Sequence, residues 1–188
     1  MPVSRRGTGR LTELEGAVLG TLRQHAPCTP YRIRRVFLDS PSPYWSGSAG
    51  AIYPLMLRLE RQGLIRSRPD ATGGRDGRLY TLTPAGTRAI REWLEPPWPP
   101  IVTGVPADPL RTRVSVLEAL SPDARSRFFR EAIAAIDQDI RDHLADKKRG
   151  RHANQPYEAA VARGALAMLR ARRRWLAETA RAVAALRR

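Results

Sequence analysis

The stretch SAGAIYPLMLRLERQGLI, from Ser48 to Ile65, decides the fold because it contains an amphipathic helix together with its stop signal. Ile52, Leu55 and Leu59 recur at helical spacing and predict one buried stripe. Gly63 interrupts this pattern, as glycines do just beyond the end of a helix. We therefore predict a helix over most of the stretch and a different kind of structure after it.

The other side of this predicted helix is polar and needs an explanation of its own. Tyr53 and Arg58 lie on a different face from the leucines. Pro54 follows Tyr53, and a proline one or two turns inside a helix removes a backbone donor and tends to kink or restart the helix. A partner outside the protein core would explain why this face is polar.

Two further helices are predicted before this stretch, each with its own N-terminal signal. Thr12 and Glu15 form the capping-box pattern T-x-x-E, which opens the first helix. Thr29 and Pro30 give the N-cap and first-position signature of the second, which runs to about Leu38. The segment SPSPYWSGS that follows is predicted to be a turn. The apolar positions of the two helices are Leu14, Val18, Leu19, Leu22, Tyr31 or Ile33, Val36 and Phe37.

The pattern after Gly63 changes from helical to extended. Residues 64–68 and 78–83 read as two strands, and the segment PDATGGRDG between them reads as a turn. Thr83 and Pro84 then cap a fourth helix. Three short helices followed by a hairpin is the order of a winged helix-turn-helix, so we predict a mainly α fold with a small β-hairpin wing.

The second half of the chain is predicted to be helical. Residues 96–109 contain six prolines, so we expect no regular element there. Asp108-Pro109, Ser121-Pro122 and Gln155-Pro156 are N-cap signals for three more helices. The last two helices carry wide apolar faces, which cannot be satisfied in isolation. Either they fold back on the winged domain or, as we favour, they form an intersubunit bundle. Their apolar positions are Phe129, Ile133, Ile136, Ile140 and Leu144, then Val161, Ala165, Met168, Trp175 and Val183, with Leu166, Leu169 and Leu176 on an adjacent face.

These elements define the predicted domain organisation. Residues 1–11 form a flexible basic arm, in which Arg5, Arg6 and Arg10 are candidates for a minor-groove contact. Residues 12–95 form a winged helix-turn-helix DNA-binding domain. Residues 96–108 form a proline-rich linker, and residues 109–188 form a helical dimerisation domain.

The charge of the chain is compatible with a polyanionic partner. There are 33 basic and 18 acidic residues, a net charge of +15, which suits nucleic acid or an acidic membrane surface. The charge is spread evenly over both halves, and arginine supplies nearly all of it, so a genomic codon bias also explains part of it. Cys28 is the only cysteine, which fits a reducing cytoplasm. The sequence contains no apolar run long enough to cross a bilayer, so no membrane-spanning segment is expected, and the favoured function involves no membrane.

The quoted stretch and its surroundings resemble the PadR-type family of winged helix-turn-helix transcriptional regulators. The resemblance covers about residues 12–94, with the motif parts in the right order. Those parts are Trp45, Ser46-Gly47-Ser48, Ala51-Ile52-Tyr53-Pro54, Leu59-Glu60 and Gly63-Leu64-Ile65, then Gly74, Arg75, Arg78, Tyr80, Leu82-Thr83-Pro84 and Gly86 in the wing.

The resemblance implies a dimeric regulator, most simply a repressor, that binds a double-stranded DNA operator and is released by an aromatic small molecule. The start of the quoted helix would enter the major groove and the wing would lie over the minor groove. The implied DNA-binding residues are Ser46, Ser48, Ala49, Gly50, Tyr53, Arg58, Arg75 and Arg78. Flat aromatic compounds stack well on indole, so Trp93, Trp98 and Trp175 are candidates for an effector pocket.

Two rival functions remain open at the level of the sequence. The winged domain could bind a protein partner instead of DNA, or the last helix could lie on a membrane surface. Enzymatic and cofactor-dependent functions are not indicated. The segment GGRDG is a hairpin turn and not a phosphate loop. The three histidines lack partners at a catalytic spacing, and His25 and Cys28 lack a second pair of metal ligands.

Overall fold

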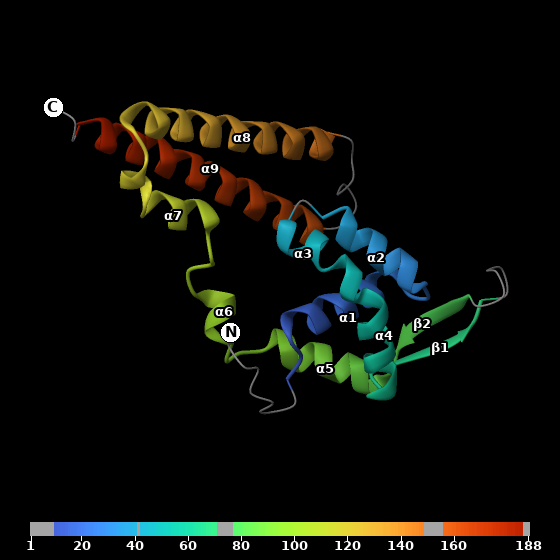
Figure 1. Ribbon diagram of the computed structural model, residues 1–188. Helices are drawn as coiled ribbons and strands as arrows, with labels where there is room; N and C mark the ends of the chain where they lie inside the picture. Colours follow the sequence, from blue (N-terminus) through green and yellow to red (C-terminus); the bar gives the residue numbers. More distant parts are fainter. Residues whose placement is uncertain (1–9, 41, 71–76, 149–155, 186–188) are drawn as a thin grey trace. The chain divides into compact units, whose positions relative to one another are not determined.

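The computed structural model describes residues 10–40, 42–70, 77–148 and 156–185. The chain divides into two compact units, residues 1–105 and residues 106–188, and both are shown in Figure 1. Most described residues are helical, and one two-stranded antiparallel sheet is present among them, which confirms the predicted fold class. Within the described ranges no helix is both long enough and apolar enough to span a bilayer.

The first unit follows the predicted order of helices and hairpin. Its elements are α1 (Glu13–His25), α2 (Pro30–Leu38), α3 (Pro43–Gly47), η1 (Ala49–Ala51), α4 (Ile52–Arg61), β1 (Ile65–Pro69), β2 (Arg78–Leu82), α5 (Pro84–Leu94) and α6 (Pro100–Thr103). Figure 1 shows α1, α2 and α4 packed together beside the hairpin. One cluster of buried side chains joins them: Val18, Leu19, Leu22, Cys28, Ile33, Phe37, Ala49, Ile52, Leu55, Met56, Leu59, Ile65, Tyr80 and Ile90.

The predicted N-terminal signals are used as caps in the first unit. The capping box of α1 is complete, because Thr12 Oγ1 accepts from the Glu15 amide and Glu15 Oε2 accepts from the Thr12 amide at 2.8 Å. Thr29 and Thr83 accept from the amides of Arg32 and Gly86 in the same way. Each of these side chains satisfies an amide that the helix itself leaves unpaired.

The start of α4 differs from the single helix predicted from Ser48. The chain forms the short helix α3 inside the segment expected to be a turn, then one 3₁₀ turn, and only then α4 from Ile52. Pro54 is therefore the third residue of α4 and not a residue one or two turns inside a longer helix. A first-turn residue has no intrahelical acceptor to lose, so Pro54 fits there without a kink.

The hairpin returns the chain from α4 to α5. β1 pairs with β2 in antiparallel register, with Ile65 opposite Leu82 and Ser67 opposite Tyr80. Gly63 makes the turn between α4 and β1 with a φ of 70°, a left-handed conformation that favours glycine. Thr83 Oγ1 donates to the Gly63 carbonyl at 2.7 Å and ties the start of α5 to this turn.

The proline-rich segment after α5 contains more regular structure than predicted. Pro100 to Thr103 form the four-residue helix α6, although no regular element was expected between residues 96 and 109. Pro100 occupies the first helical position, where its missing amide hydrogen has no intrahelical acceptor to lose. A proline at that position favours the start of a helix and does not prevent it.

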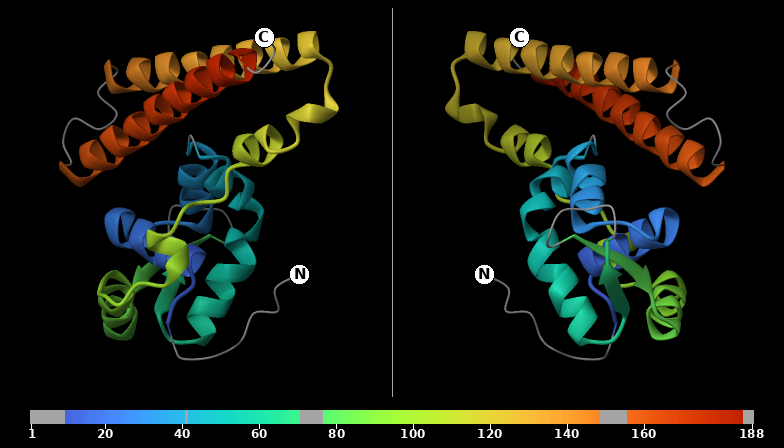
Figure 2. Two further views of the ribbon diagram at one scale, coloured as in Figure 1. Left: turned by 90° about the vertical axis from the view of Figure 1, so that its left-hand side faces the viewer. Right: turned by 90° about the vertical axis from the view of Figure 1, so that its right-hand side faces the viewer.

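The second unit is built on two long helices. Its elements are α7 (Pro109–Val114), η2 (Leu117–Ala119), α8 (Pro122–Lys148) and α9 (Pro156–Ala185). All three predicted helix starts are found, and Asp108 caps α7 through the amides of Leu110 and Arg111. Helices α8 and α9 lie side by side in the views of Figures 1 and 2. Their shared core has Leu117, Phe129, Ile136 and Leu176 at its centre.

The two apolar faces predicted for α9 are buried to different extents within the unit. Leu176 is completely buried and Leu169 packs beside it, whereas Val161 is 73 % exposed and Met168 is 65 % exposed. Two arginines of α9 are held by carboxylates of the same unit. Arg172 donates to Asp108 at 2.9 Å, and Arg173 pairs with Asp137.

Candidate nucleic-acid interface

The outer face of α4 is formed by side chains that the core does not use. Tyr53 is 48 % exposed and Leu57 is 56 % exposed, and the two are four residues apart, so they are neighbours on one helix face. Arg61 follows at the next such position and is also exposed. A face of this kind, on the helix that follows the turn of a helix-turn-helix, has the dimensions to enter a major groove.

The small residues before α4 have different environments. Ser48 Oγ donates to the Tyr44 carbonyl at 2.7 Å, and Ser46 Oγ donates to the Ser42 carbonyl at 3.3 Å, so both hydroxyls are engaged by the preceding turn. Gly50 is exposed, but Ala49 is only 2 % exposed and belongs to the hydrophobic core. The methyl group of Ala49 therefore packs in the core, and a contact of this residue with DNA would have to come from its backbone.

Arg58 lies on α4 but is tied to α1. Its guanidinium donates to Glu15 Oε1 at 3.0 Å, and Glu15 also accepts from Thr12. Burial alone would raise the pKa of Glu15, but the hydrogen bonds from Thr12 and Arg58 and the charge of Arg58 outweigh it and lower this pKa below its ordinary value. Arg58 is half exposed, so its remaining donors are available to a phosphate while the ion pair holds α4 against α1.

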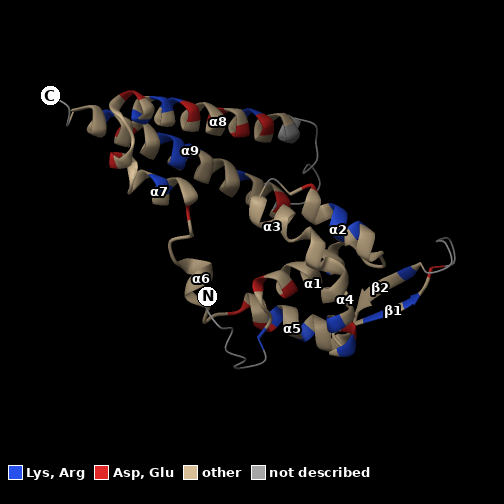
Figure 3. Ribbon diagram, viewed as in Figure 1, with Lys and Arg blue, Asp and Glu red and all other residues tan. Residues whose placement is uncertain are grey.

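The wing places its arginines on two different faces. Arg78 donates to Ser67 Oγ at 2.8 Å and lies 3.9 Å from Glu60, so its charge is partly neutralised. Arg75, the other predicted wing contact, lies outside the described residues, as do Arg5 and Arg6 of the predicted arm. Arg66 and Arg68 are exposed on β1, and no described carboxylate pairs with either. Figure 3 shows the basic colouring of this strand.

Sequence reasoning missed Leu57, Arg66 and Arg68 as candidates for the interface. The signal for the two arginines was present, because alternate residues of a strand share a face and Ile65 had to point inward. A signal for Leu57 was also present, because it lies four residues after Tyr53 and therefore on the face opposite to the stripe of Ile52, Leu55 and Leu59. It was missed because an apolar residue in an amphipathic helix was taken to belong to the core.

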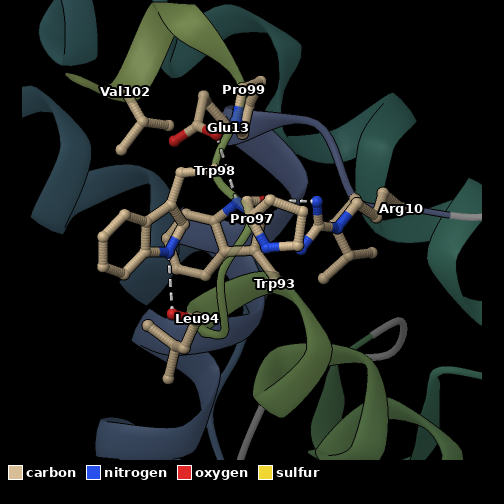
Figure 4. Close-up of a pocket in the computed structure, with 9 residues that line it drawn as sticks. Arg10, Glu13, Trp93, Leu94, Pro97, Trp98, Pro99 and Val102 are labelled. Atoms are coloured by element: carbon tan, nitrogen blue, oxygen red, sulfur yellow. Dashed lines mark hydrogen bonds between the residues drawn. The ribbon is translucent and has the colours of Figure 1, made fainter.

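A second site lies within the first unit, at the end of α5. Trp93 and Trp98 line a cavity of about 680 Å³, together with Arg10, Leu11, Glu13, Leu94, Pro97, Pro99 and Val102. Figure 4 shows both indoles among the residues that line this cavity. The third predicted tryptophan, Trp175, packs in the core of the second unit, beside Leu176. The structure thus brings together two of the three predicted pocket residues.

Hydrogen bonds fix the wall of this cavity. Arg10 donates to the main-chain carbonyls of Glu95 at 2.9 Å, Glu92 at 3.4 Å and Pro97, and so caps the C-terminal end of α5. Trp98 Nε1 donates to the Leu94 carbonyl at 2.9 Å, and Trp93 Nε1 donates to Glu13 Oε1 at 3.3 Å. Figure 4 draws the bonds of the two indoles to Leu94 and Glu13. A cavity with two oriented indoles suits a flat aromatic ligand.

The geometry defines the first unit as a winged helix-turn-helix. Among the described residues, no cluster of three or more His, Cys, Asp or Glu side chains could hold a metal ion.

Comparison with known proteins shows what the chain is similar to. Residues 18–92 match the family model described as "Transcriptional regulator PadR-like family". The negative transcriptional regulator PadR of Bacillus subtilis is 28 % identical over 132 residues, which are 69 % of this chain and 70 % of that protein. The crystal structure of Bacillus subtilis PadR in complex with operator DNA superposes with a TM-score of 0.76 at 22 % identity, covering 92 % of this chain and 99 % of that one. The crystal structure of Bacillus subtilis PadR in complex with p-coumaric acid superposes with a TM-score of 0.72 at 22 % identity. This superposition covers 90 % of this chain and 98 % of that one.

Over residues 18–92 the chain is similar to PadR-like transcriptional regulators, and its fold is similar to that of the Bacillus subtilis PadR structures. The proteins matched in this way are transcriptional regulators and not enzymes.

Proposed function

We propose that this protein is a dimeric repressor that binds a DNA operator through α4 and the wing. The observation that carries the proposal is the outer face of α4, where Tyr53, Leu57 and Arg61 are all exposed and form no part of the core. Tyr53 and Arg61 suit phosphate contacts, which fix the register on the duplex. Gly50 permits close approach of the backbone at the start of this face.

The exposed arginines of β1 extend this surface. Arg66 and Arg68 point from one face of the strand, and four such arginines in a dimer would neutralise phosphates on either side of the operator. Arg78 and Arg58 are secondary contacts in this proposal, because each already interacts with a glutamate. The operator-bound relative supports this assignment, since its fold covers almost the whole chain.

Dimerisation is assigned to the second unit. Tyr157, Val161 and Met168 are exposed on α9 at spacings of four and seven residues, so they follow one face of the helix. This apolar face is not covered within the unit. A second copy of α9 would bury it and hold two reading heads at a fixed spacing, as an operator with two half-sites requires.

The effector site is assigned to the cavity between α1 and the end of α5. A planar aromatic molecule of the size of a phenolic acid would stack on Trp93 or Trp98, and a relative has been crystallised with p-coumaric acid. Arg10 and Glu13 supply polar groups at the rim. Since Trp93 packs on α1 and α1 supports α4 through Glu15, a ligand that shifts Trp93 also displaces the reading helix. The protein would act in the cytoplasm, because the operator would be there.

The experiment is a selection of binding sites from random duplexes with the full-length protein, followed by mobility shifts with titrated p-coumaric acid. We expect one inverted-repeat operator, bound at nanomolar concentration and released by the acid. Trp98→Ala should bind the operator as the wild type does but resist release. Binding without sequence preference would overturn the operator proposal. Normal release of Trp98→Ala would overturn the cavity as the effector site.

A further inference from the structure

We propose that Leu57 reads a thymine by contact with its 5-methyl group, and that it sets part of the operator sequence. The inference rests on the proposed function, because it requires α4 to lie in the major groove. It adds a residue that determines which DNA sequence is bound. Tyr53, Arg61 and the wing would instead contact the DNA backbone whatever its sequence.

The position of Leu57 separates it from the other apolar residues of α4. Ile52, Leu55, Met56 and Leu59 are all buried. Leu57 is more than half exposed and belongs to neither hydrophobic cluster of the described residues. A single exposed leucine is common on protein surfaces and indicates no function by itself. Its meaning here comes from its place in the middle of the outer face of the reading helix.

The neighbours of Leu57 on this face fix what it can contact. Tyr53 lies one turn before it and Arg61 lies one turn after it, and both are exposed. If these two side chains hold phosphates, the side chain between them faces the base edges at the floor of the groove. Leu57 has no hydrogen-bonding group, so it cannot read the donors and acceptors of a guanine, cytosine or adenine.

The major groove offers one apolar group that distinguishes a base, the methyl group of thymine. Contact with Leu57 would remove both that methyl and the exposed leucine from water. Burial of one methyl-sized group corresponds to about a fourfold change in affinity. An uncontacted polar edge opposite Leu57 would instead lose water without a replacement, so the other bases are disfavoured as well.

The test replaces each thymine of the selected operator with uracil, one position at a time, which removes only the methyl group. We expect wild type to lose about fourfold affinity at one position in each half-site. Leu57→Ala removes the contact from both half-sites, so it should bind the original operator about sixteenfold more weakly and show no further loss of affinity at either position. Leu57→Met keeps an apolar side chain, so replacement of the same thymine by uracil should still lower its affinity about twofold. Leu38→Ala changes an exposed leucine outside α4 and should behave as wild type.

Three outcomes would overturn the inference. The first is a wild type that binds every uracil-substituted operator as well as the original. The second is a Leu57→Ala variant that keeps the full methyl effect. The third is a chain that selects no sequence at all, and this result alone would also remove the proposed function. Because Leu57 lies outside the core, a folding defect of Leu57→Ala is not expected, and circular dichroism checks this.

Discussion

The indole of Trp93 lies so close to Gly16 of α1 that a β-carbon at residue 16 would overlap the ring. The same tryptophan donates to Glu13, one turn earlier on α1. Two residues nearly at opposite ends of the first unit's sequence therefore form a single contact, and the cavity at the end of α5 depends on it. Gly16 is required because of this close approach, whereas Gly20 in the same helix has open space around it.

Gly16→Ala should destabilise the first unit by about 1–3 kcal/mol, because the added methyl must push the Trp93 ring out of its place. Gly20→Ala is the matched control. It should stabilise the protein by about 0.5–1 kcal/mol, since alanine is the better helix former and nothing lies within 4 Å of the new atom. Urea unfolding followed by circular dichroism measures both. Equal effects of the two substitutions would contradict the packing described for Trp93.

The stability contributed by Glu15 should depend on pH. Its pKa is lowered in the folded protein, so the folded state favours the ionised carboxylate, and this stabilisation is present above about pH 4.5 and is lost as the pH falls below that value. The free energy of unfolding of Glu15→Gln should therefore differ most from that of wild type between about pH 5 and 7, and the two values should converge in acid. Arg58→Met removes one of the hydrogen-bond partners of Glu15, so it should reduce part of the pH dependence of the unfolding free energy. Parallel stability curves for wild type and Glu15→Gln would show that the carboxylate is not held in this way.

Replacement of Arg66 and Arg68 by alanine should reduce the salt dependence of operator binding. Four charges are removed from a dimer, so the slope of log affinity against log salt should become shallower by about 3 to 4. Arg170→Ala with Arg174→Ala on α9 removes the same charge from exposed positions of the second unit and should leave the slope nearly unchanged. If the α9 variant changes the slope and the wing variant does not, DNA lies along the C-terminal helices.

Charged residues on the uncovered face of α9 should separate the protomers. Val161→Glu with Met168→Glu should give a monomer by light scattering, because two carboxylates per chain would be buried without partners in the dimer. Arg163→Glu with Arg170→Glu changes exposed residues on another face of α9 and should leave the dimer intact. The monomeric variant should also bind the operator far more weakly, since two linked half-sites contribute together. A dimer that survives the first double substitution would assign the interface elsewhere.

The local elements of this protein could be predicted from the sequence because their signals act over a few residues. Thr12 and Glu15 lie within one turn of each other, and Thr29 and Thr83 each directly precede a proline that starts a helix. The order of helices and hairpin followed from such signals. One local prediction failed because the prolines of the linker were taken only as helix breakers. Pro100 instead occupies the first position of a helix inside this segment.

The tertiary structure decided which side chains are available, because availability depends on contacts between residues far apart in the chain. Arg58 meets a carboxylate 43 residues away, and Trp93 bonds to one 80 residues away. Ala49 is buried and Leu57 is exposed, although both fit the predicted amphipathic stretch. Apolar spacing defines the faces of a helix, but only the packing of α1 and α2 against α4 determines which of those faces remains in water.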